Sequence, residues 1–425
     1  MKNVLFLVVD CLRADRVQDA GRARVPMLER LRDEGLSFTQ AISGASNTTP
    51  SFATMLTGRY PFVHGVRQLR SRLGPGIPVL PEMLATQGYR TIARVTGPLF
   101  DDSGIGRGFD DYGYREPEAY LASSWGRDLV REIRSFRAPW FMLLHVWELH
   151  WPRQAPLSYR LRRTGDTLYD QALSALDRQL RDVFAALPAD TVVVVTGDHG
   201  ERLDTTYDRA DAVGIATYLA RPAWHTLRRL APSRFGKALD QVRRNAGLPD
   251  ELHGRLAGFG LNDYLVRVPL VFWGPGVPKA RRVAAQVRHV DIAPTILDLV
   301  GAAEQPGLER SLLTRGEMAD RLAYSEASDE RINWIACVRD GRWKYVLEPE
   351  RPDARGMLFD VIEDPTEQRD VSGTEPQRAQ ALRERLLELI ASGTREGAIV
   401  AQERPPEQER RVLDRLADLG YLEDR

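Results

Sequence analysis

Acidic and imidazole side chains in this sequence follow directly after short apolar runs. Asp10 comes after the run Val4–Val9, and Asp198 with His199 comes shortly after the run Thr191–Val195. Carboxylate and imidazole groups suit a divalent cation. When such runs are strands of one open α/β sheet, their carboxyl ends meet at the edge where ligands bind. The pattern therefore indicates a site, although charged residues also terminate strands for structural reasons alone.

A third group of the same kind lies in the middle of the chain. His145 closes the apolar run Phe141–His145, and Glu148 and His150 follow shortly after it. One such residue at a strand end is commonly structural. Several strand ends that carry acids and histidines together favour a binding or catalytic site.

The hydroxyl-rich segment Ser46–Gly58 is typical of a helix with reactive groups at its start. Pro50 suits the first helical position, where its missing N–H costs nothing, and Gly58 can end the helix. Thr48 or Thr49 then lies at the cap. A hydroxyl there meets free N–H groups and a partial positive charge, which suits an alkoxide or an oxyanion such as phosphate or sulfate. The segment also fits an ordinary capped helix.

The elements that must position these residues alternate between strands and helices. Strands that are apolar on both faces and alternate with helices predict an α/β fold, with a mostly parallel central sheet covered by helices on both faces. The expected strands are Val4–Val9, Thr91–Val95, Phe141–His145, Thr191–Val195 and Val268–Phe272. The expected helices include Val25–Glu34, Ser51–Leu56, Leu80–Gln87, Tyr169–Ala186 and Ile292–Val300.

Residues 1–315 are expected to form the catalytic domain, with a helical, basic insertion at about residues 201–260. Between Leu219 and Asn245 the chain carries many arginines but the single acid Asp240, with apolar residues at roughly helical spacing. One interpretation is a basic lid that recognises an anionic substrate or an anionic membrane surface. The other is a solvated amphipathic hairpin packed beside the site.

The chain changes character after residue 315. Residues 316–375 are predicted to form a small C-terminal α+β subdomain with an antiparallel sheet, in which Asp340-Gly341 is a hairpin turn. Residues 376–425 are predicted to form a helical, charged tail that begins with an amphipathic helix over Gln377–Ser392. The expected strands of the subdomain are Trp334–Val338, Trp343–Leu347 and Met357–Asp360.

Composition argues against several classes of protein. Lysine plus arginine and aspartate plus glutamate each number 59, and this neutral balance predicts no nucleic-acid partner. Two cysteines, Cys11 and Cys337, cannot form a disulfide framework. No apolar run approaches the roughly 20 residues of a transmembrane segment, and the N-terminal run is shorter than a signal-peptide core. We therefore expect a cytoplasmic protein; its oligomeric state is not predicted.

The segment after Ser46 resembles the sulfatase signature, in which cysteine or serine is followed by any residue, then Pro-Ser-Arg, and later Thr-Gly. Thr48 stands at the nucleophile position, and Pro50-Ser51 and Thr57-Gly58 match the rest. The resemblance covers nearly all of residues 3–372, so the chain is identified as a sulfatase-like member of the alkaline phosphatase superfamily. Further similar segments, in the family's order, are Asn3–Asp15, His145–Pro152, Thr196–Glu201, His253–Gly254, Arg267–Leu270, His289–Thr295 and Arg342–Tyr345.

The resemblance implies a metal centre and a nucleophile. Asp10, Asp198 and His199 would bind a divalent metal ion, with the Thr48 oxygen as a further ligand. Thr48 would attack phosphorus or sulfur and form a covalent ester, which water then cleaves. A metal ion beside the hydroxyl lowers its pKa and makes this attack accessible near neutral pH.

The resemblance also implies roles around the ester. His150 and His253 would hold its oxygens or protonate the leaving group, while Asn47 and Glu148 would contact the substrate. A second metal ion, if one binds, would take Glu148, His150 and His253 as ligands. The short spacing between Glu148 and His150 favours one ion over two.

Three positions depart from true sulfatases. Thr48 replaces the cysteine or serine that can be oxidised to formylglycine, and Phe52 replaces the signature arginine. Cys11 stands where sulfatases usually place a second metal-binding aspartate, which disfavours a calcium-type oxygen cage. Two aspartates, one histidine and one threonine instead favour zinc or manganese, with calcium or magnesium as alternatives.

A threonine nucleophile resembles the phosphodiesterase and phosphoethanolamine-transferase branches of the superfamily. A Thr48 ester must be hydrolysed by attack at phosphorus, because no geminal hydroxyl exists to expel the group. We therefore expect a metal-dependent hydrolase of anionic phosphoesters, with phosphodiesters or phosphonate esters favoured. The alternatives are a sulfate ester hydrolase, a phosphoryl-alcohol transferase acting on a glycan or lipid, and a binding protein without activity.

Overall fold

The computed structural model describes most of the chain. Within the described residues, no helix is long and apolar enough to cross a membrane. The expected basic insertion lies almost entirely outside these residues, so its two interpretations stay predictions. The described residues are 1–18, 22–116, 118–151, 153, 155–156, 158–159, 164–203, 260–314, 321–329, 332–351, 355–395 and 405–419.

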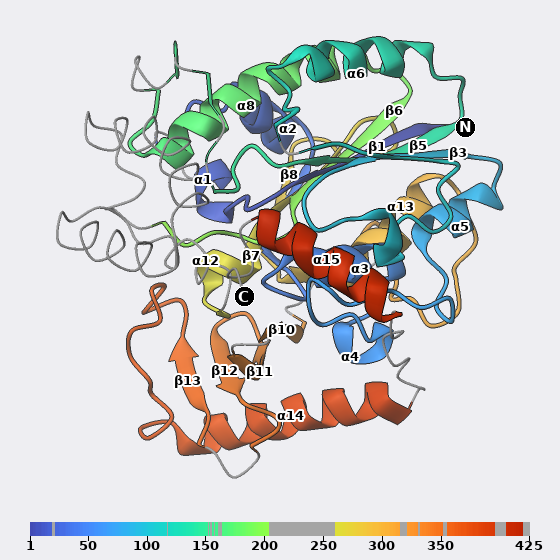
Figure 1. The fold of residues 1–425 in the computed structure, drawn as a ribbon. Coiled ribbons are helices and arrows are strands. Elements are labelled where there is room, and N and C mark those ends of the chain that lie inside the picture. The colour runs from blue at the N-terminus through green and yellow to red at the C-terminus, as the bar shows by residue number, and fades with distance from the viewer. Residues whose placement is uncertain are drawn as a thin grey trace, which may run out of the picture.

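A central nine-stranded sheet runs through the molecule (Figure 1). Its order is β4-β3-β5-β1-β6-β7-β2-β8, and β9 also pairs with β2. The five predicted strands are present as β1, β3, β5, β6 and β7, and the predicted α/β fold is confirmed. The strands are β1 (Asn3–Val9), β2 (Leu36–Ile42), β3 (Arg90–Val95), β4 (Asp111–Tyr114), β5 (Trp140–Val146), β6 (Thr191–Gly197), β7 (Arg267–Trp273), β8 (Arg281–Val283) and β9 (Val287–Arg288).

One predicted strand runs against its neighbours. β7 pairs antiparallel with β6 and β2, whereas β1 pairs parallel with β5 and β6. Helix α12 (Asp263–Val266) explains this direction, because the Gly200 N–H after β6 donates to the Leu265 carbonyl at 2.7 Å. The chain therefore enters β7 at the edge where β6 ends and runs back beside it.

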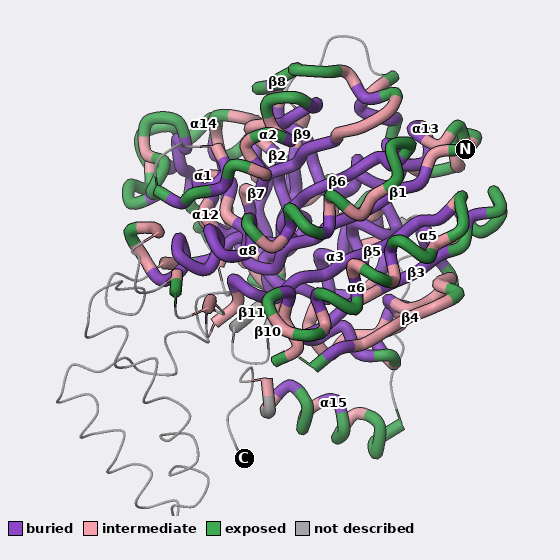
Figure 2. Tube along the Cα trace, turned by 90° about the horizontal axis from the view of Figure 1, so that it is seen from above, coloured by how far each residue is buried: buried purple, intermediate pink, exposed green. Residues whose placement is uncertain are grey.

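Helices cover both faces of the sheet, as Figure 1 shows, and Figure 2 shows most of the strands buried beneath them. Side chains of β1 alternate between two apolar cores: Val4, Phe6 and Val8 join one, and Leu5, Leu7 and Val9 join the other. The first core receives α3 (Thr48–Thr57), α5 (Leu80–Ala85) and α13 (Ile292–Leu299). The second receives α2 (Pro26–Glu34), α6 (Ser124–Ser135) and α8 (Leu168–Phe184). Shorter helices are α1 (Ala14–Gln18) and α4 (Pro61–His64).

A four-stranded antiparallel sheet forms the C-terminal subdomain, as predicted. Its order is β10-β11-β12-β13, and β10 is a strand that the sequence pattern did not predict. Helix α14 (Pro376–Arg395) packs on it with α4, while α15 (Pro406–Asp418) packs against Phe100 of the large domain. The domain boundaries expected near residues 315 and 375 stay predictions. The strands are β10 (Ala323–Asp329), β11 (Ile332–Arg339), β12 (Trp343–Leu347) and β13 (Met357–Asp360).

The second sheet is bonded to the segment that leads into α3. Ser325 Oγ donates to the Ser43 carbonyl at 2.6 Å. The Glu326 N–H donates to the Gly44 carbonyl at 3.1 Å, and the Ser46 N–H donates to the Glu326 carbonyl at 3.3 Å. β10 therefore fixes the path of the chain immediately before the helix with the candidate nucleophile.

Candidate metal centre and nucleophile

Asp10 lies at the carboxyl end of β1, in the middle of the sheet. Its N–H donates to the Val146 carbonyl at 2.9 Å, which continues the pairing of β1 with β5. The side chain is fully buried, and its Oδ2 accepts a hydrogen bond from Thr48 Oγ1 at 3.2 Å. Oδ1 has no hydrogen-bond partner among the described residues. A carboxylate oxygen buried in this way requires a cation if it is to stay ionised.

Asp198 and His199 follow the neighbouring strand β6 and reach the same edge. Asp198 Oδ1 accepts two backbone N–H groups, from His199 at 2.8 Å and from Cys11 at 3.2 Å. Its Oδ2 is buried and, within the described part of the chain, accepts no hydrogen bond. One oxygen of Asp198 therefore holds the loop, and the other is left for a ligand.

The imidazole of His199 is oriented by its own loop. Nδ1 lies 2.7 Å from the Gly200 carbonyl, so this nitrogen carries a proton and donates it to that oxygen. Nε2 then presents its lone pair 3.5 Å from Thr48 Oγ1 and 3.6 Å from Asp198 Oδ2. A metal-binding histidine usually has this arrangement, with one nitrogen bonded to the backbone and the other free to ligate.

Thr48 is the first residue of α3 and lies directly beside these groups. Asn47 precedes the helix with an extended backbone, at φ −143° and ψ 160°. Pro50 is thus the third helical residue and not the first as predicted, because the helix begins earlier; its missing N–H still costs nothing in the first turn. Gly58 ends the helix at φ 64°, as predicted. The Thr48 hydroxyl is therefore fixed at the positive end of the helix dipole.

The charges of the centre act on one another. Burial raises the pKa of Asp10, but the hydrogen bond to His145 and the charges of His150 and His199 outweigh it and hold that pKa well below its usual range. Burial, and then the charge of Asp10, raise the pKa of Asp198 to about 6. Two carboxylates this close cannot both ionise without a positive partner, and a divalent cation supplies one.

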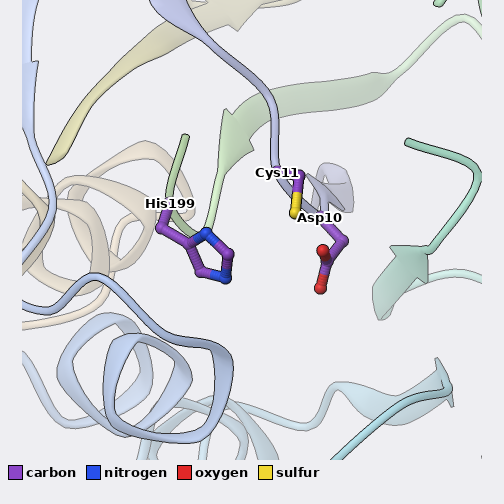
Figure 3. A group of neighbouring side chains, drawn as sticks. All are labelled: Asp10, Cys11 and His199. Carbon is purple, nitrogen blue, oxygen red and sulfur yellow. The ribbon is translucent and has the colours of Figure 1, made fainter. Parts of the chain in front are cut away.

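The donor atoms form two groups that share Asp10. One donor atom each from Asp10, Cys11 and His199 lie within 4.8 Å of one another, and so do donor atoms from Asp10, His145 and Asp198. Figure 3 shows the first group, in which the His199 ring faces the side chains of Asp10 and Cys11. Together with the unpartnered oxygens of Asp10 and Asp198, these residues fit a divalent cation.

His145 lies at this centre; the sequence pattern placed it among the strand-end residues of the site but assigned it no specific role. Its Nδ1 donates to the Thr96 carbonyl at 3.2 Å, and its Nε2 is 3.4 Å from Asp10 Oδ2. Val8 and His145 are partners in the register of β1 and β5, and Asp10 follows Val8 by two residues, so all three point to one face. Phe52, at the position of the signature arginine, packs edge-on against the His145 ring at 4.9 Å.

Glu148 is held by the backbone and not by the centre. Its Oε1 accepts the Leu121 N–H at 2.8 Å, and its Oε2 accepts the Trp147 N–H at 2.7 Å. Arg115 Nη2 lies 3.6 Å from the same Oε2. Because both oxygens of this buried carboxylate have partners, the geometry does not favour the predicted roles in substrate binding or at a second metal ion.

His150 lies close enough to the centre for the charge of Asp10 to act on it. Its Nδ1 donates to the Trp151 carbonyl at 2.7 Å, and its ring stacks on Trp147 at 3.9 Å between centroids. Burial lowers the pKa of His150 to about 4, although Asp10 opposes this shift. Because the neutral ring carries its one proton on Nδ1, Nε2 has no proton to donate, and the roles of His150 at the ester oxygens and the leaving group stay predictions.

Two more residues from the sequence prediction have different outcomes, and a third residue, His64, is described with them. His253 lies outside the described residues. Asn47 is 6% exposed, and its amide oxygen accepts no hydrogen bond in the described part of the structure; its role as a substrate contact stays a prediction. His64 bonds to Thr54 Oγ1 and to the Val66 N–H, both at 3.1 Å, as a structural residue would.

Known proteins resemble this chain in sequence. A family model described as Sulfatase matches residues 2–302. Arylsulfatase K of Mus musculus is 29% identical over 174 residues, which cover 36% of this chain and only 31% of the mouse protein. Arylsulfatase K of Homo sapiens is 26% identical over 447 residues, which cover 91% of this chain and 82% of the human protein.

Known structures share the fold over nearly the whole chain. The phosphonate monoester hydrolase of Agrobacterium radiobacter superposes with a TM-score of 0.66 at 18% sequence identity. The superposition covers 92% of this chain and 96% of that one. At this level of identity the likeness shows a common arrangement of strands and helices.

Proposed function

This chain belongs to the sulfatase family, as its sequence motifs predicted, and from that premise we propose that it is a metal-dependent hydrolase of phosphoesters with Thr48 as its nucleophile. Phosphodiesters and phosphonate esters are the favoured substrates. The proposed metal ligands are Asp10, Asp198, His199 and the Thr48 oxygen. Zinc or manganese is favoured over calcium or magnesium, because these residues offer one nitrogen and only three oxygen ligands, whereas calcium prefers about six to eight oxygen ligands.

The position of the Thr48 hydroxyl carries this proposal. It lies 3.2 Å from Asp10 Oδ2 and 3.5 Å from His199 Nε2, at the start of α3. Pro50 has no N–H, and the Ser51 N–H donates to the Asn47 carbonyl at 3.2 Å. The N–H groups of Thr48 and Thr49 have no partner within the helix, so they are suited to bind the oxygens of a transferred phosphoryl group. One short segment thus supplies both the attacking oxygen and donors for the charge that develops.

The reaction would proceed in two displacements. The Thr48 oxygen forms a bond to phosphorus while the bond from phosphorus to the alcohol breaks, and the hydroxyl proton leaves along its hydrogen bond to Asp10. The departing alkoxide takes a proton from solvent. Water then attacks phosphorus and releases a proton to solvent. The bond from phosphorus to Thr48 breaks, and the Thr48 oxygen takes back the proton from Asp10, which restores the hydroxyl. A bound divalent cation would lower the hydroxyl pKa and neutralise charge on the transferred group.

The identity of the nucleophile supports phosphorus over sulfur. A threonine ester has no geminal hydroxyl that could expel the bound group, so turnover needs direct attack on the central atom. Phosphoesters allow this attack more readily than sulfate esters do. The phosphonate monoester hydrolase of Agrobacterium radiobacter, which shares this fold, is named for the hydrolysis of a phosphonate ester.

A second candidate, sulfate ester hydrolysis, is favoured by the family match and by the arylsulfatase relatives. The two candidates differ in which ester the same nucleophile attacks. A third, transfer of a phosphoryl-alcohol group to a glycan or lipid, differs only in the acceptor that resolves the Thr48 ester.

The test is a substrate panel with one aryl leaving group on a phosphodiester, a phosphonate monoester, a phosphomonoester and a sulfate ester. We expect the highest kcat/KM for the first two, and loss of activity by a factor of about 10³ or more in Thr48→Ala. Thr48→Ser, which keeps the hydroxyl, is the matched control. Turnover of the sulfate ester alone would refute the phosphoester assignment, and full activity of Thr48→Ala would refute the nucleophile.

A further inference from the structure

Cys11 lies beside the candidate metal centre, and the proposed reaction gives it no role. A donor atom of Asp10, the Cys11 sulfur and a nitrogen of His199 all lie within 4.8 Å of one another (Figure 3). The thiol is free of any disulfide and buried, with 2% of the residue exposed. Its side chain also belongs to the second apolar core, so the thiol lies where that core borders the centre.

The backbone conformation after β1 places the side chains of both Asp10 and Cys11 at the candidate metal centre. Successive side chains of a strand point to opposite sides, so adjacent residues do not normally share a centre. Cys11 has a φ of 60°, a conformation that is costly for any residue but glycine and that recurs at functional sites. Its N–H donates to Asp198 Oδ1 at 3.2 Å, and the Tyr169 hydroxyl donates to its carbonyl at 2.7 Å.

Two carboxylate oxygens at the same centre point independently to a cation. Asp10 Oδ1 and Asp198 Oδ2 belong to fully buried side chains, and neither has a hydrogen-bond partner within the described ranges. The Cys11 sulfur shares the Asp10 group with His199, whose Nε2 presents a lone pair. A cation held by Asp10 and His199 would therefore lie within reach of the sulfur.

We propose that the Cys11 thiolate is itself a ligand of the metal ion, in the place where sulfatases use the oxygen of a second aspartate. This inference rests on the metal dependence proposed above. When the bond from metal to sulfur forms, the S–H bond breaks, its electron pair stays on sulfur for donation to the metal, and the proton passes to solvent. A soft thiolate selects zinc over manganese, calcium and magnesium.

Cobalt(II) is the probe for this ligand, because thiolate coordination gives an intense charge-transfer absorption band in the near ultraviolet. The Cys337→Ser variant contains Cys11 as its one cysteine, and Cys337 is buried in the C-terminal sheet away from the centre. We expect cobalt-loaded wild type and Cys337→Ser to show the band equally. Cys11→Ser should lose it and should bind zinc more weakly by about 10-fold or more, with little change for manganese.

The outcomes separate this inference from the proposed function. Weaker visible bands of cobalt report that the ion is bound, whatever its ligands are. Visible bands without the charge-transfer band in Cys337→Ser would overturn the thiolate ligand and leave the metal-dependent hydrolase standing. Absence of both kinds of band, with no cobalt retained on dialysis, would overturn the metal dependence and the thiolate ligand together. The Cys337→Ser spectrum decides even if Cys11→Ser does not fold.

Discussion

At the scale of single residues, the centre is built from acidic groups that the fold brings together against their mutual repulsion. Asp10 and Asp198 end adjacent strands, and within the described residues the basic side chains that pair with their carboxylates are histidines, with no lysine or arginine. His145 and His199 direct their Nε2 atoms at these carboxylates, because a backbone carbonyl accepts the proton on Nδ1 in each. A bound divalent ion would compensate the negative charge of the two carboxylates better than protonation of one of them.

The pH dependence of metal stabilisation follows from Asp198. Its pKa is raised to about 6, so in the metal-free protein it contributes stability that is present below about pH 4 and is lost as the pH rises through about 6. Metal binding requires the ionised form and acts in the opposite direction. We expect the increase in Tm on zinc addition to be larger at about pH 7 than at about pH 5.

The comparison of metal-loaded and chelated samples corrects for other groups. Burial also raises the pKa of Asp177 to about 6. Asp177 only accepts backbone N–H groups of α2, so it contributes equally to the Tm of the metal-loaded and the chelated sample at each pH. The difference in Tm between the two samples therefore reports on the metal centre alone. A zinc effect of equal size at both pH values would contradict the assignment of Asp198 as a ligand.

Much of this centre could be predicted from local patterns in the sequence. Asp10, Asp198 and His199 follow apolar runs, and Thr48 begins a helix with recognisable start and end signals. His145 could not be assigned, because its place depends on the register between β1 and β5, which no local pattern contains. The bonds of Glu148 to two loop N–H groups are equally invisible in the sequence.

At the scale of elements, α12 holds the loop that presents His199. The Gly200 N–H donates to the Leu265 carbonyl at 2.7 Å, and the Glu201 N–H donates to the Tyr264 carbonyl at 3.1 Å. α12 leads directly into β7, so the sheet itself sets its position. The position of β7 therefore determines the position of α12, and α12 in turn holds the loop that orients the His199 ring.

The variant Gly200→Ala tests this connection. A Cβ at Gly200 would lie 2.0 Å from the Tyr264 carbonyl oxygen, which is backbone and cannot move without shifting α12. We expect zinc affinity to fall by about 10- to 100-fold, measured by competition with a chelating dye. Gly260→Ala, at a position shortly before α12, is the control, because the nearest neighbour of its Cβ would be the Leu265 side chain at 3.2 Å. Equal zinc affinity in the two variants would show that α12 does not position His199.

The apolar runs predicted five strands of the large sheet, and the periodicity predicted helices α2, α3, α5, α8 and α13 but not α6. β2 was not predicted, because Thr39 and Gln40 interrupt its apolar pattern where its register with β7 shifts. The direction of β7 was also beyond prediction, since it depends on where α12 returns the chain. β8 and β9 are too short for any period to show.

At the scale of the whole molecule, a buried ion cluster joins the two sheets. Lys344 of β12 is fully buried, and its Nζ lies 3.0 Å from Asp263 Oδ1 and 2.6 Å from Glu367 Oε1. Arg339 Nη2 of β11 lies 3.1 Å from Asp263 Oδ2. Because Asp263 begins α12, the C-terminal subdomain contributes to the same element that positions His199.

Removal of the buried cation should destabilise both domains as one unit. Lys344→Met leaves Asp263 and Glu367 buried with less positive charge, and we expect a loss of about 3–5 kcal/mol in the free energy of unfolding. The matched change Arg411→Met breaks an exposed pair with Glu407 and should cost less than about 0.5 kcal/mol. Urea unfolding measures both values. Two separate transitions in the wild type, with only one of them shifted, would contradict the coupling.

Mass spectrometry of the enzyme quenched during turnover of an aryl phosphonate monoester tests the nucleophile most directly. The phosphonyl group keeps its carbon substituent, so its mass identifies the adduct without ambiguity. If Thr48 attacks phosphorus, the peptide that contains Thr48 gains this group in the wild type, and no adduct forms in Thr48→Ala. An adduct on another residue, or turnover by Thr48→Ala at the wild-type rate, would contradict the central claim.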